Sequence, residues 1–193
     1  MAEGRRGPGG LEEACRYALG LLARRPRTRR ELETKLASRG YPETVVADVL
    51  ARCIEAGYID DRRFAEAWVE ECCRSRPRGS RRLRVELRRR GVAPELVEAA
   101  LRALIPEERE VELATFVVER RLQGRMAGAH EGTAADDLPR RLWGLLRRRG
   151  FGPGASKEAL RRVLGPREDL AGVDEWDGQV DNQSDERLEF SKG

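Results

Sequence analysis

One sequence pattern that occurs three times restricts the fold of this chain more than any other feature. Each copy has a leucine eight residues before a glycine, a second leucine four before it and an arginine immediately before it. An apolar residue follows the glycine, and a further leucine lies ten residues after it. Such repetition is typical of proteins built from stacked, similar helical units. The copies cover residues 31–50, 82–101 and 141–160 and align on Gly40, Gly91 and Gly150.

The shared pattern predicts a helix, a tight turn and a second helix. Two leucines four residues apart form one apolar stripe on a helix. Glycine then ends the helix, because the residue after the last turn often takes a left-handed backbone that other residues adopt only with strain. An arginine in the last turn stabilises the negative end of the helix dipole. The prolines that follow, suited to the first turn of the next helix, are Pro42, Pro94 and Pro153.

A further amphipathic segment precedes each copy, at residues 11–23, 62–74 and 107–122. The sequence therefore predicts an all-α fold without a sheet, an elongated tandem array of three three-helix repeats. Thr28 and Glu31 form a Thr-x-x-Glu capping box for the middle helix of the first repeat. The expected divisions are a disordered N-terminus at 1–10, repeats at 11–60, 61–106 and 107–165, a loop at 123–137 inside the third repeat, and an acidic disordered tail at 166–193.

Charge is divided unevenly along the chain. Residues 166–193 contain nine acidic and three basic residues, a net charge of −6, whereas residues 1–165 carry +10. A basic body of this kind indicates a polyanionic partner, and an acidic tail that folds back over it would inhibit that binding. Arginine makes up 35 of the 38 basic residues. Genome base composition alone would produce that bias, so the placement of the arginines is more informative than their number.

The arginines are densest over residues 74–90, which contain nine arginines and a single acidic residue. Like charges three or four residues apart repel each other on a helix, so this density favours an anionic partner, either nucleic acid or an acidic protein surface, over a merely solvated face. The predicted contact residues are Arg78, Arg81, Arg82, Arg84, Arg88 and Arg89, with Arg140, Arg141, Arg147 and Arg148 in the third repeat.

Residues that suggest catalysis or metal binding have a simpler interpretation. Asp60 and Asp61 directly precede an expected helix, where a carboxylate accepts hydrogen bonds from free backbone N–H groups, so we interpret both as helix caps. The four cysteines lack the spacing of a zinc site and suit small apolar positions on helices. No phosphate-binding glycine loop occurs. We expect no enzymatic activity, no cofactor and no metal.

No segment of the sequence resembles a membrane anchor. A transmembrane helix needs about 18 or more consecutive apolar residues, and no such run occurs. The first ten residues contain arginines without the apolar stretch of a secretory signal. We expect a cytoplasmic protein.

Three short motifs carry a resemblance to a known family. They are Glu-Leu-x-x-Lys-Leu-x-x-x-Gly at 31–40, an apolar residue with Ile-Asp-Asp-x-x-Phe-Ala at 58–65, and Gly79, Leu87 and Arg90-Gly91 in the following segment. Together with the repeats they make about residues 11–165 similar to the RecX family. The resemblance weakens in the third repeat, where residues 123–137 depart from a tighter family pattern.

The resemblance implies a curved, elongated monomer that lies in the groove of the filament formed by RecA recombinase on DNA. Such proteins bridge RecA subunits, limit filament growth and suppress ATP hydrolysis and strand exchange in DNA repair, recombination and the SOS response. DNA binding is then weak or occurs through the filament. The alternatives are an independent, sequence-nonspecific nucleic-acid-binding protein and a general helical adaptor. The motif residues expected to be structural are Gly40, Asp60, Asp61, Phe64, Gly79, Gly91 and Gly150.

Overall fold

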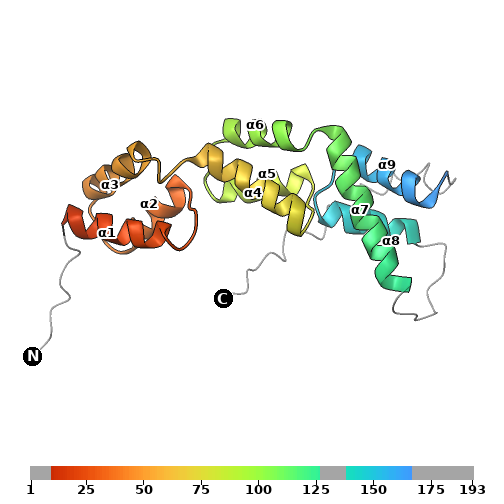
Figure 1. Cartoon of the computed structure of the whole chain (residues 1–193), viewed down its shortest axis with the longest axis horizontal. Helices are drawn as coiled ribbons and strands as arrows, with labels where there is room; N and C mark the ends of the chain where they lie inside the picture. Colours follow the sequence, from red (N-terminus) through yellow and green to blue (C-terminus); the bar gives the residue numbers. More distant parts are fainter. Residues whose placement is uncertain (1–9, 127–137, 167–193) are drawn as a thin grey trace, which may run out of the picture. The chain divides into compact units, whose positions relative to one another are not determined.

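The computed structural model describes residues 10–126 and 138–166, and this part of the chain consists of helices joined by turns, without strands (Figure 1). The all-α helical-repeat prediction is confirmed. The expected disordered ends and the centre of the expected loop lie outside the described residues. The helices are α1 (Leu11–Leu22), α2 (Arg29–Ser38), α3 (Glu43–Glu55), α4 (Asp61–Ser75), α5 (Ser80–Arg89), α6 (Pro94–Leu104), α7 (Glu107–Met126), α8 (Leu138–Arg148) and α9 (Pro153–Leu164).

Helix α7 is longer than the sequence pattern predicts. The sequence pattern predicts that this helix ends at residue 122 and that the loop begins at residue 123. In the structure α7 continues to Met126. The residues around Gly124 are good helix formers, and one glycine inside a helix costs only about 1 kcal/mol relative to alanine. The prediction that the loop starts at residue 123 is therefore wrong.

Two compact units make up the chain. In the part of the chain that the structure describes, unit 1 is 10–69 with Val85–Ala100, and unit 2 is Glu70–Arg84 with 101–126 and 138–166. The division falls inside α4 and inside α5, so each unit contains part of the second repeat. The repeat boundaries expected from the sequence stay a prediction.

The core of unit 1 is formed by α1, α2 and α3, which pack against one another (Figure 1). The leucine stripe of α2 supplies its centre, since Leu32 and Leu36 are fully buried. The remaining buried residues of this cluster are Ala14, Ala18, Tyr41, Val46, Val49, Leu50, Cys53 and Ile59.

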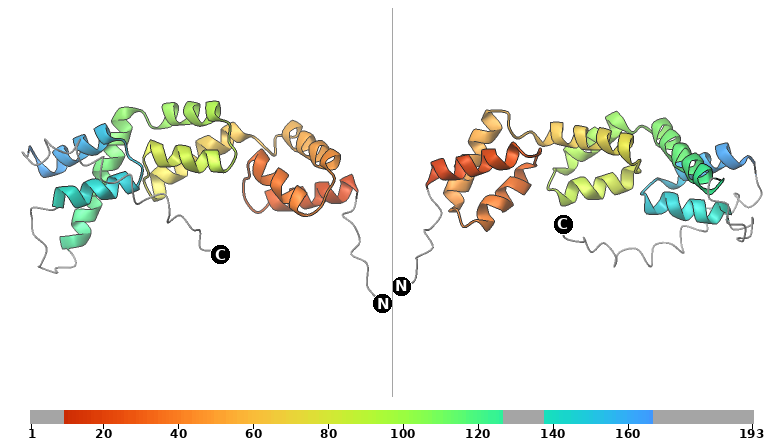
Figure 2. Two further views of the ribbon diagram at one scale, coloured as in Figure 1. Left: turned by 180° about the vertical axis from the view of Figure 1, so that it is seen from behind. Right: turned by 60° about the horizontal axis from the view of Figure 1, so that its bottom comes forward.

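In unit 2, α7 packs against α9 and also contacts α8 (Figure 2). The stripe of the third repeat is again buried, with Leu142 and Leu146 at its centre, and Trp143 and Phe151 are the largest side chains in the core. The other members of this cluster are Ala114, Val117, Val118, Ala159 and Leu160.

All three repeat glycines end their helices in the same way. Gly40, Gly91 and Gly150 have φ angles of 88°, 84° and 81°, in the left-handed region. In each turn the N–H two residues beyond the arginine donates to the carbonyl of the second stripe leucine, as in a Schellman motif. The residues after the glycines are buried, namely Tyr41, Val92 and Phe151. The predicted role of these glycines is confirmed.

Cysteine packing also follows the prediction. Cys53, Cys72 and Cys73 are buried, and Cys15 is half-buried. Burial raises the pKa of the Cys53 and Cys73 thiols. Within residues 10–126 and 138–166, no cluster of three or more potential metal ligands occurs. None of the helices in that part is both long and apolar enough to cross a membrane.

Candidate anion-binding site

The first residues of α2 bind the turn that ends α5, through contacts that lie wholly within unit 1. Thr28 Oγ1 donates to the carbonyl of Arg90 at 2.6 Å, and the Arg29 N–H donates to the Asp61 carboxylate at 2.8 Å. One otherwise unpaired N–H of α2 and one carbonyl at the end of α5 are thereby satisfied. We call this set of contacts, with Glu31, the Arg90 interface.

The two aspartates of the family motif have different partners. Asp60 Oδ1 accepts from the Arg63 N–H at 3.0 Å and caps α4, as predicted. Asp61 instead caps α2, so the prediction that both aspartates cap the following helix is wrong for Asp61. Its backbone is already in the first turn of α4, which leaves its side chain available to the neighbouring helix. Burial raises the pKa of the Asp61 carboxyl.

Arg90 is neutralised and covered within this interface. Its Nη1 lies 2.6 Å from Glu31 Oε1, and the Glu31 side chain is only 18% exposed. The Arg90 guanidinium also lies 4.0 Å from the centre of the Trp68 ring, a cation–π distance. Thr28 caps α2 as the capping box predicts, but Glu31 pairs with Arg90 and Arg25.

An equivalent set of contacts occurs in unit 2, where the start of α5 binds the turn that ends α8. The Gly79 N–H donates to the carbonyl of Arg149 at 2.9 Å, as Thr28 does to Arg90. The Ser80 N–H donates to Glu110 Oε1 at 2.9 Å, as Arg29 does to Asp61. We call this set, with Arg82, the Arg149 interface.

The Arg149 interface differs from the Arg90 interface in its charges. The acid of the first, Glu31, lies nine residues before its repeat glycine, and the equivalent residue before Gly91 is Arg82. Burial lowers the pKa of the Arg149 guanidinium, and neighbouring arginines lower it further. Among the described residues Arg149 forms no ion pair, and its side chain donates only to the Pro77 carbonyl, at 3.5 Å. The neighbouring arginines are Arg120, Arg82 and Arg78.

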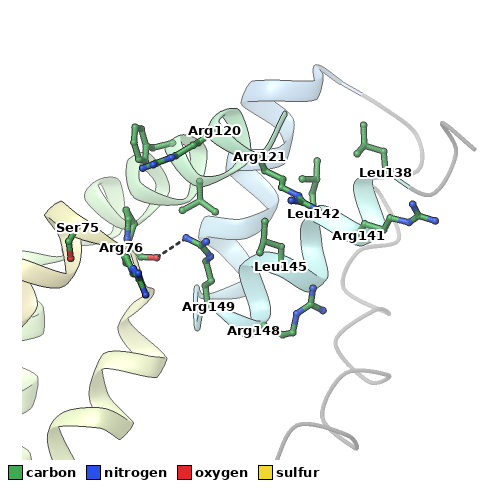
Figure 3. A pocket seen from close by; sticks show the side chains of 13 residues that line it. Ser75, Arg76, Arg120, Arg121, Leu138, Arg141, Leu142, Leu145, Arg148 and Arg149 are labelled. Carbon is green, nitrogen blue, oxygen red and sulfur yellow. Dashed lines mark hydrogen bonds between the residues drawn. The ribbon is translucent and has the colours of Figure 1, made fainter. Parts of the chain in front are cut away.

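A pocket of about 730 Å³ opens beside Arg149, within unit 2. Its lining contains six arginines and no acidic residue. Leucines of α8 lie between the arginines in Figure 3, and α7 adds the aromatic side chain of Phe116, a residue that is 48% exposed. We call this the arginine pocket; it is lined by Ser75, Arg76, Pro77, Phe116, Val117, Arg120, Arg121, Leu138, Arg141, Leu142, Leu145, Arg148 and Arg149.

The predicted contact arginines are only partly brought together. Arg141 and Arg148 line the arginine pocket, while Arg78 and Arg82 lie near Arg149. Arg82 also donates to the carbonyl of Arg148 at 3.3 Å. Arg81, Arg84 and Arg140 also belong to unit 2, as exposed or half-buried side chains outside the pocket lining.

The remaining three predicted arginines lie outside the pocket. Arg88 and Arg89 are exposed in unit 1, where Arg88 pairs with Glu98 at 3.6 Å. Arg147 is half-buried, and its Nη1 donates to the Phe151 carbonyl at 2.9 Å, so it stabilises the turn after α8.

Four arginines of the pocket were missed by the site prediction, namely Arg76, Arg120, Arg121 and Arg149. Arg120 and Arg121 belong to α7, about thirty residues after the dense arginine stretch, and no local pattern connects the two segments. A detectable signal existed at one position. In the repeat alignment Arg82 stands at the position of Glu31. The Glu31–Arg90 ion pair of the first interface is therefore replaced by two arginines, Arg82 and Arg149, in the second.

Family models match two parts of the chain, "RecX, first three-helix domain" over residues 14–53 and "RecX, second three-helix domain" over residues 60–101. Curated relatives named "Regulatory protein RecX" include one from Mycolicibacterium smegmatis, 42% identical over 72% of this chain and 73% of the relative. The relative from Thermobifida fusca is 39% identical over 84% of this chain and 89% of its own.

Solved structures share the fold. The crystal structure of RecX from Lactobacillus salivarius aligns with a TM-score of 0.69 at 22% identity, covering 79% of this chain and 96% of that one. A second crystal structure, of a regulatory protein RecX, aligns with a TM-score of 0.63 at 23% identity, covering 75% of this chain and 68% of that one.

Proposed function

The chain belongs to the RecX family of regulatory proteins, and from this membership we propose that it binds the RecA–DNA filament and inhibits filament growth, ATP hydrolysis and strand exchange. The observation that carries the proposal is the similarity to curated relatives named "Regulatory protein RecX", at 39–42% identity over most of the chain. The arginine pocket supports it, because a filament that carries DNA is polyanionic.

We propose that this regulation is by binding alone. The described residues form helical interfaces and an arginine-lined pocket, and the aspartates of the family motif are engaged as helix caps. Helical repeats offer extended surfaces for a partner. A monomer that occupies successive filament subunits would inhibit without chemistry of its own.

The test is the ATPase activity of RecA from the same organism on single-stranded DNA, titrated with the full-length chain. Inhibition at far less than one copy per RecA subunit is expected, because one bound regulator blocks extension for many subunits. A variant with Arg81, Arg82, Arg84 and Arg88 replaced by alanine should inhibit less. Unchanged inhibition by that variant would overturn the assignment of these arginines to the contact surface, and no inhibition by the original chain would overturn the proposed function.

A second candidate function is independent, sequence-nonspecific binding of nucleic acid, which the six arginines of the pocket favour. The dependence of binding affinity on salt concentration, measured together with the effect on RecA, distinguishes the two functions. Each phosphate contact on duplex DNA contributes a slope of about 0.9 to the fall of log affinity with log salt concentration. Steep salt dependence without any effect on RecA would favour this second function.

A further inference from the structure

Phe116 is an exposed aromatic residue of α7, and the two residues that follow it in the helix are buried. Phe116 is 48% exposed, whereas Val117 and Val118 are at most 4% exposed. A single exposed apolar side chain is common and by itself indicates nothing. Phe116, however, lines the arginine pocket, so its ring is presented beside cationic groups.

The charged residues that line the pocket are all arginines, although Phe116 also has Glu112 and Glu119 one turn away on its own helix. Besides Arg120 and Arg121 on its own helix, the pocket receives Arg148 and Arg149 from the end of α8 and Arg76 from the end of α4 (Figure 3). None of these five forms an ion pair within the described part of the chain. Burial and neighbouring positive charge lower the pKa of Arg149, so an entering anion would relieve an unfavourable interaction.

We propose that the arginine pocket binds a short stretch of single-stranded nucleic acid, with one base stacked on Phe116 and the adjoining phosphates bound by Arg120, Arg148 and Arg149. Single-strand-binding proteins combine these two elements, an aromatic ring for a base and cationic groups for the backbone. The pocket volume of about 730 Å³ lies in the range of small-molecule sites and suits one or two nucleotides.

The exposed aromatic side chain of Phe116 favours a single strand over a duplex. Bases in a duplex are stacked on one another, so their faces are closed to a side chain, whereas unpaired bases are free to stack on aromatic residues. An acidic protein segment such as this chain's own residues 166–193, which also contain Trp176 and Phe190, is the competing occupant, and the deletion and crosslinking experiments below separate it from nucleic acid. The inference deepens the proposed function, and rests on it for the place of this site on a RecA–DNA filament.

Binding is measured by fluorescence anisotropy of a labelled oligothymidylate of about 10 nucleotides, within the usual site size of such proteins, with the full-length chain and no RecA. Phe116→Leu keeps an apolar side chain and is expected to weaken binding about tenfold, as loss of one stacked base does. Tyr58→Leu is the matched control, since Tyr58 is an exposed aromatic in unit 1 and should leave affinity unchanged. Circular dichroism melting verifies that each variant folds.

The arginines are tested by the salt dependence of the same assay. Arg149→Ala should weaken binding and reduce the log–log slope by about 0.7, the value per phosphate on a single strand. Arg52→Ala is the control, because Arg52 is an exposed arginine of unit 1 that belongs to neither interface. Equal losses for Arg149→Ala and Arg52→Ala would mean that only net charge matters, which overturns the site.

Stacking is tested directly by photocrosslinking to an oligonucleotide that contains 5-iodouracil. The expected crosslink falls in the tryptic peptide of residues 110–120, which contains Phe116, and is lost in Phe116→Leu. Crosslinks only elsewhere, or unchanged affinity of Phe116→Leu, would overturn the inference. If removal of residues 166–193 raises affinity while Phe116→Leu has no effect, the pocket binds an acidic segment instead. RecA inhibition, measured separately, remains the test of the proposed function.

Discussion

The Arg90 and Arg149 interfaces have equivalent hydrogen bonds but different electrostatics, although Thr28 donates through its side-chain hydroxyl and Gly79 through its backbone N–H. In both, the residue before a helix donates to the carbonyl of the arginine in the next repeat's turn, and an acidic side chain caps the first N–H of that helix. Arg90 is then neutralised by Glu31, whereas Arg149 faces Arg82 at the equivalent position. The hydrogen bonds therefore hold the repeats together without the ion pair.

This difference separates what stabilises the fold from what is available to a partner. Arg90 is half-buried, and its guanidinium charge is neutralised by the Glu31 carboxylate and stacked on the Trp68 ring. A partly buried arginine among other arginines costs stability until an anion arrives, and such costs are concentrated at functional sites. The comparison assigns Arg90 to structure and supports the assignment of Arg149 to binding.

The largest expected effect concerns the glycines of the two turns. Gly150→Ala should lower the free energy of unfolding by about 3 kcal/mol, because a left-handed alanine is strained and its Cβ would meet the backbone of Arg82. Gly91→Ala meets only the side chain of Arg30 and should cost less. Gly57→Ala is the control, with a φ of 71° and nothing within 4 Å, and should cost about 1 kcal/mol. Urea denaturation midpoints check this order, and equal losses would contradict the close approach at Gly150.

Removing the two turn arginines should have unequal effects. Arg90→Ala deletes an ion pair at 2.6 Å and a cation–π contact, leaving Glu31 partly buried, and should cost about 2 kcal/mol. Arg149→Ala removes a charge that its neighbours repel and should cost less than about 0.5 kcal/mol. Thermal unfolding at low salt measures both. A larger loss for Arg149→Ala would show that Arg149 is as structural as Arg90.

The missing ion pair of the Arg149 interface can be introduced. Arg82→Glu places a carboxylate where the Arg90 interface has Glu31 and should be about 1 kcal/mol more stable than Arg82→Ala, the value of a charge-assisted hydrogen bond. The alanine variant removes the interactions of Arg82 itself from the comparison. The same Arg82→Glu variant should bind oligothymidylate more weakly than Arg82→Ala. If Arg82→Glu is less stable than Arg82→Ala and binds oligothymidylate with the same affinity, the two interfaces are not equivalent.

The smallest expected effect is a pH dependence at Asp61. Burial raises the pKa of its carboxyl in the folded state above the ordinary value of 3.8, so the folded chain holds this proton more tightly than the unfolded chain. As pH rises from about 3.8 through the raised pKa, the original chain should lose stability relative to Asp61→Asn, whose side-chain oxygen still accepts from Arg29. Unfolding free energies measured between about pH 4 and 7 test the sign. A relative gain with rising pH would mean that the hydrogen bond outweighs burial.

Most of the fold followed from local rules. Leu32, Leu36 and their equivalents predicted the buried stripes, and the repeat glycines predicted the turns, because helix periodicity and left-handed backbone are properties of a few consecutive residues. Helix α7 is longer than predicted because helix-forming residues on both sides of Gly124 extend it past residue 123, where the loop was expected to begin.

The sequence by itself determined the all-α repeats, the family and the presence of dense arginine. Only the tertiary structure decided which arginines share a site. The pocket brings together α7, the turn after α8 and the end of α4, and these segments are too far apart in the sequence for a local periodic pattern to connect them. The same reason explains Asp61, whose partner Arg29 lies 32 residues earlier in the chain. The sequence gives the charge of each residue, but only the folded structure shows which charges are neutralised by a neighbour. Arg90 has Glu31 as such a neighbour, and Arg149 has other arginines.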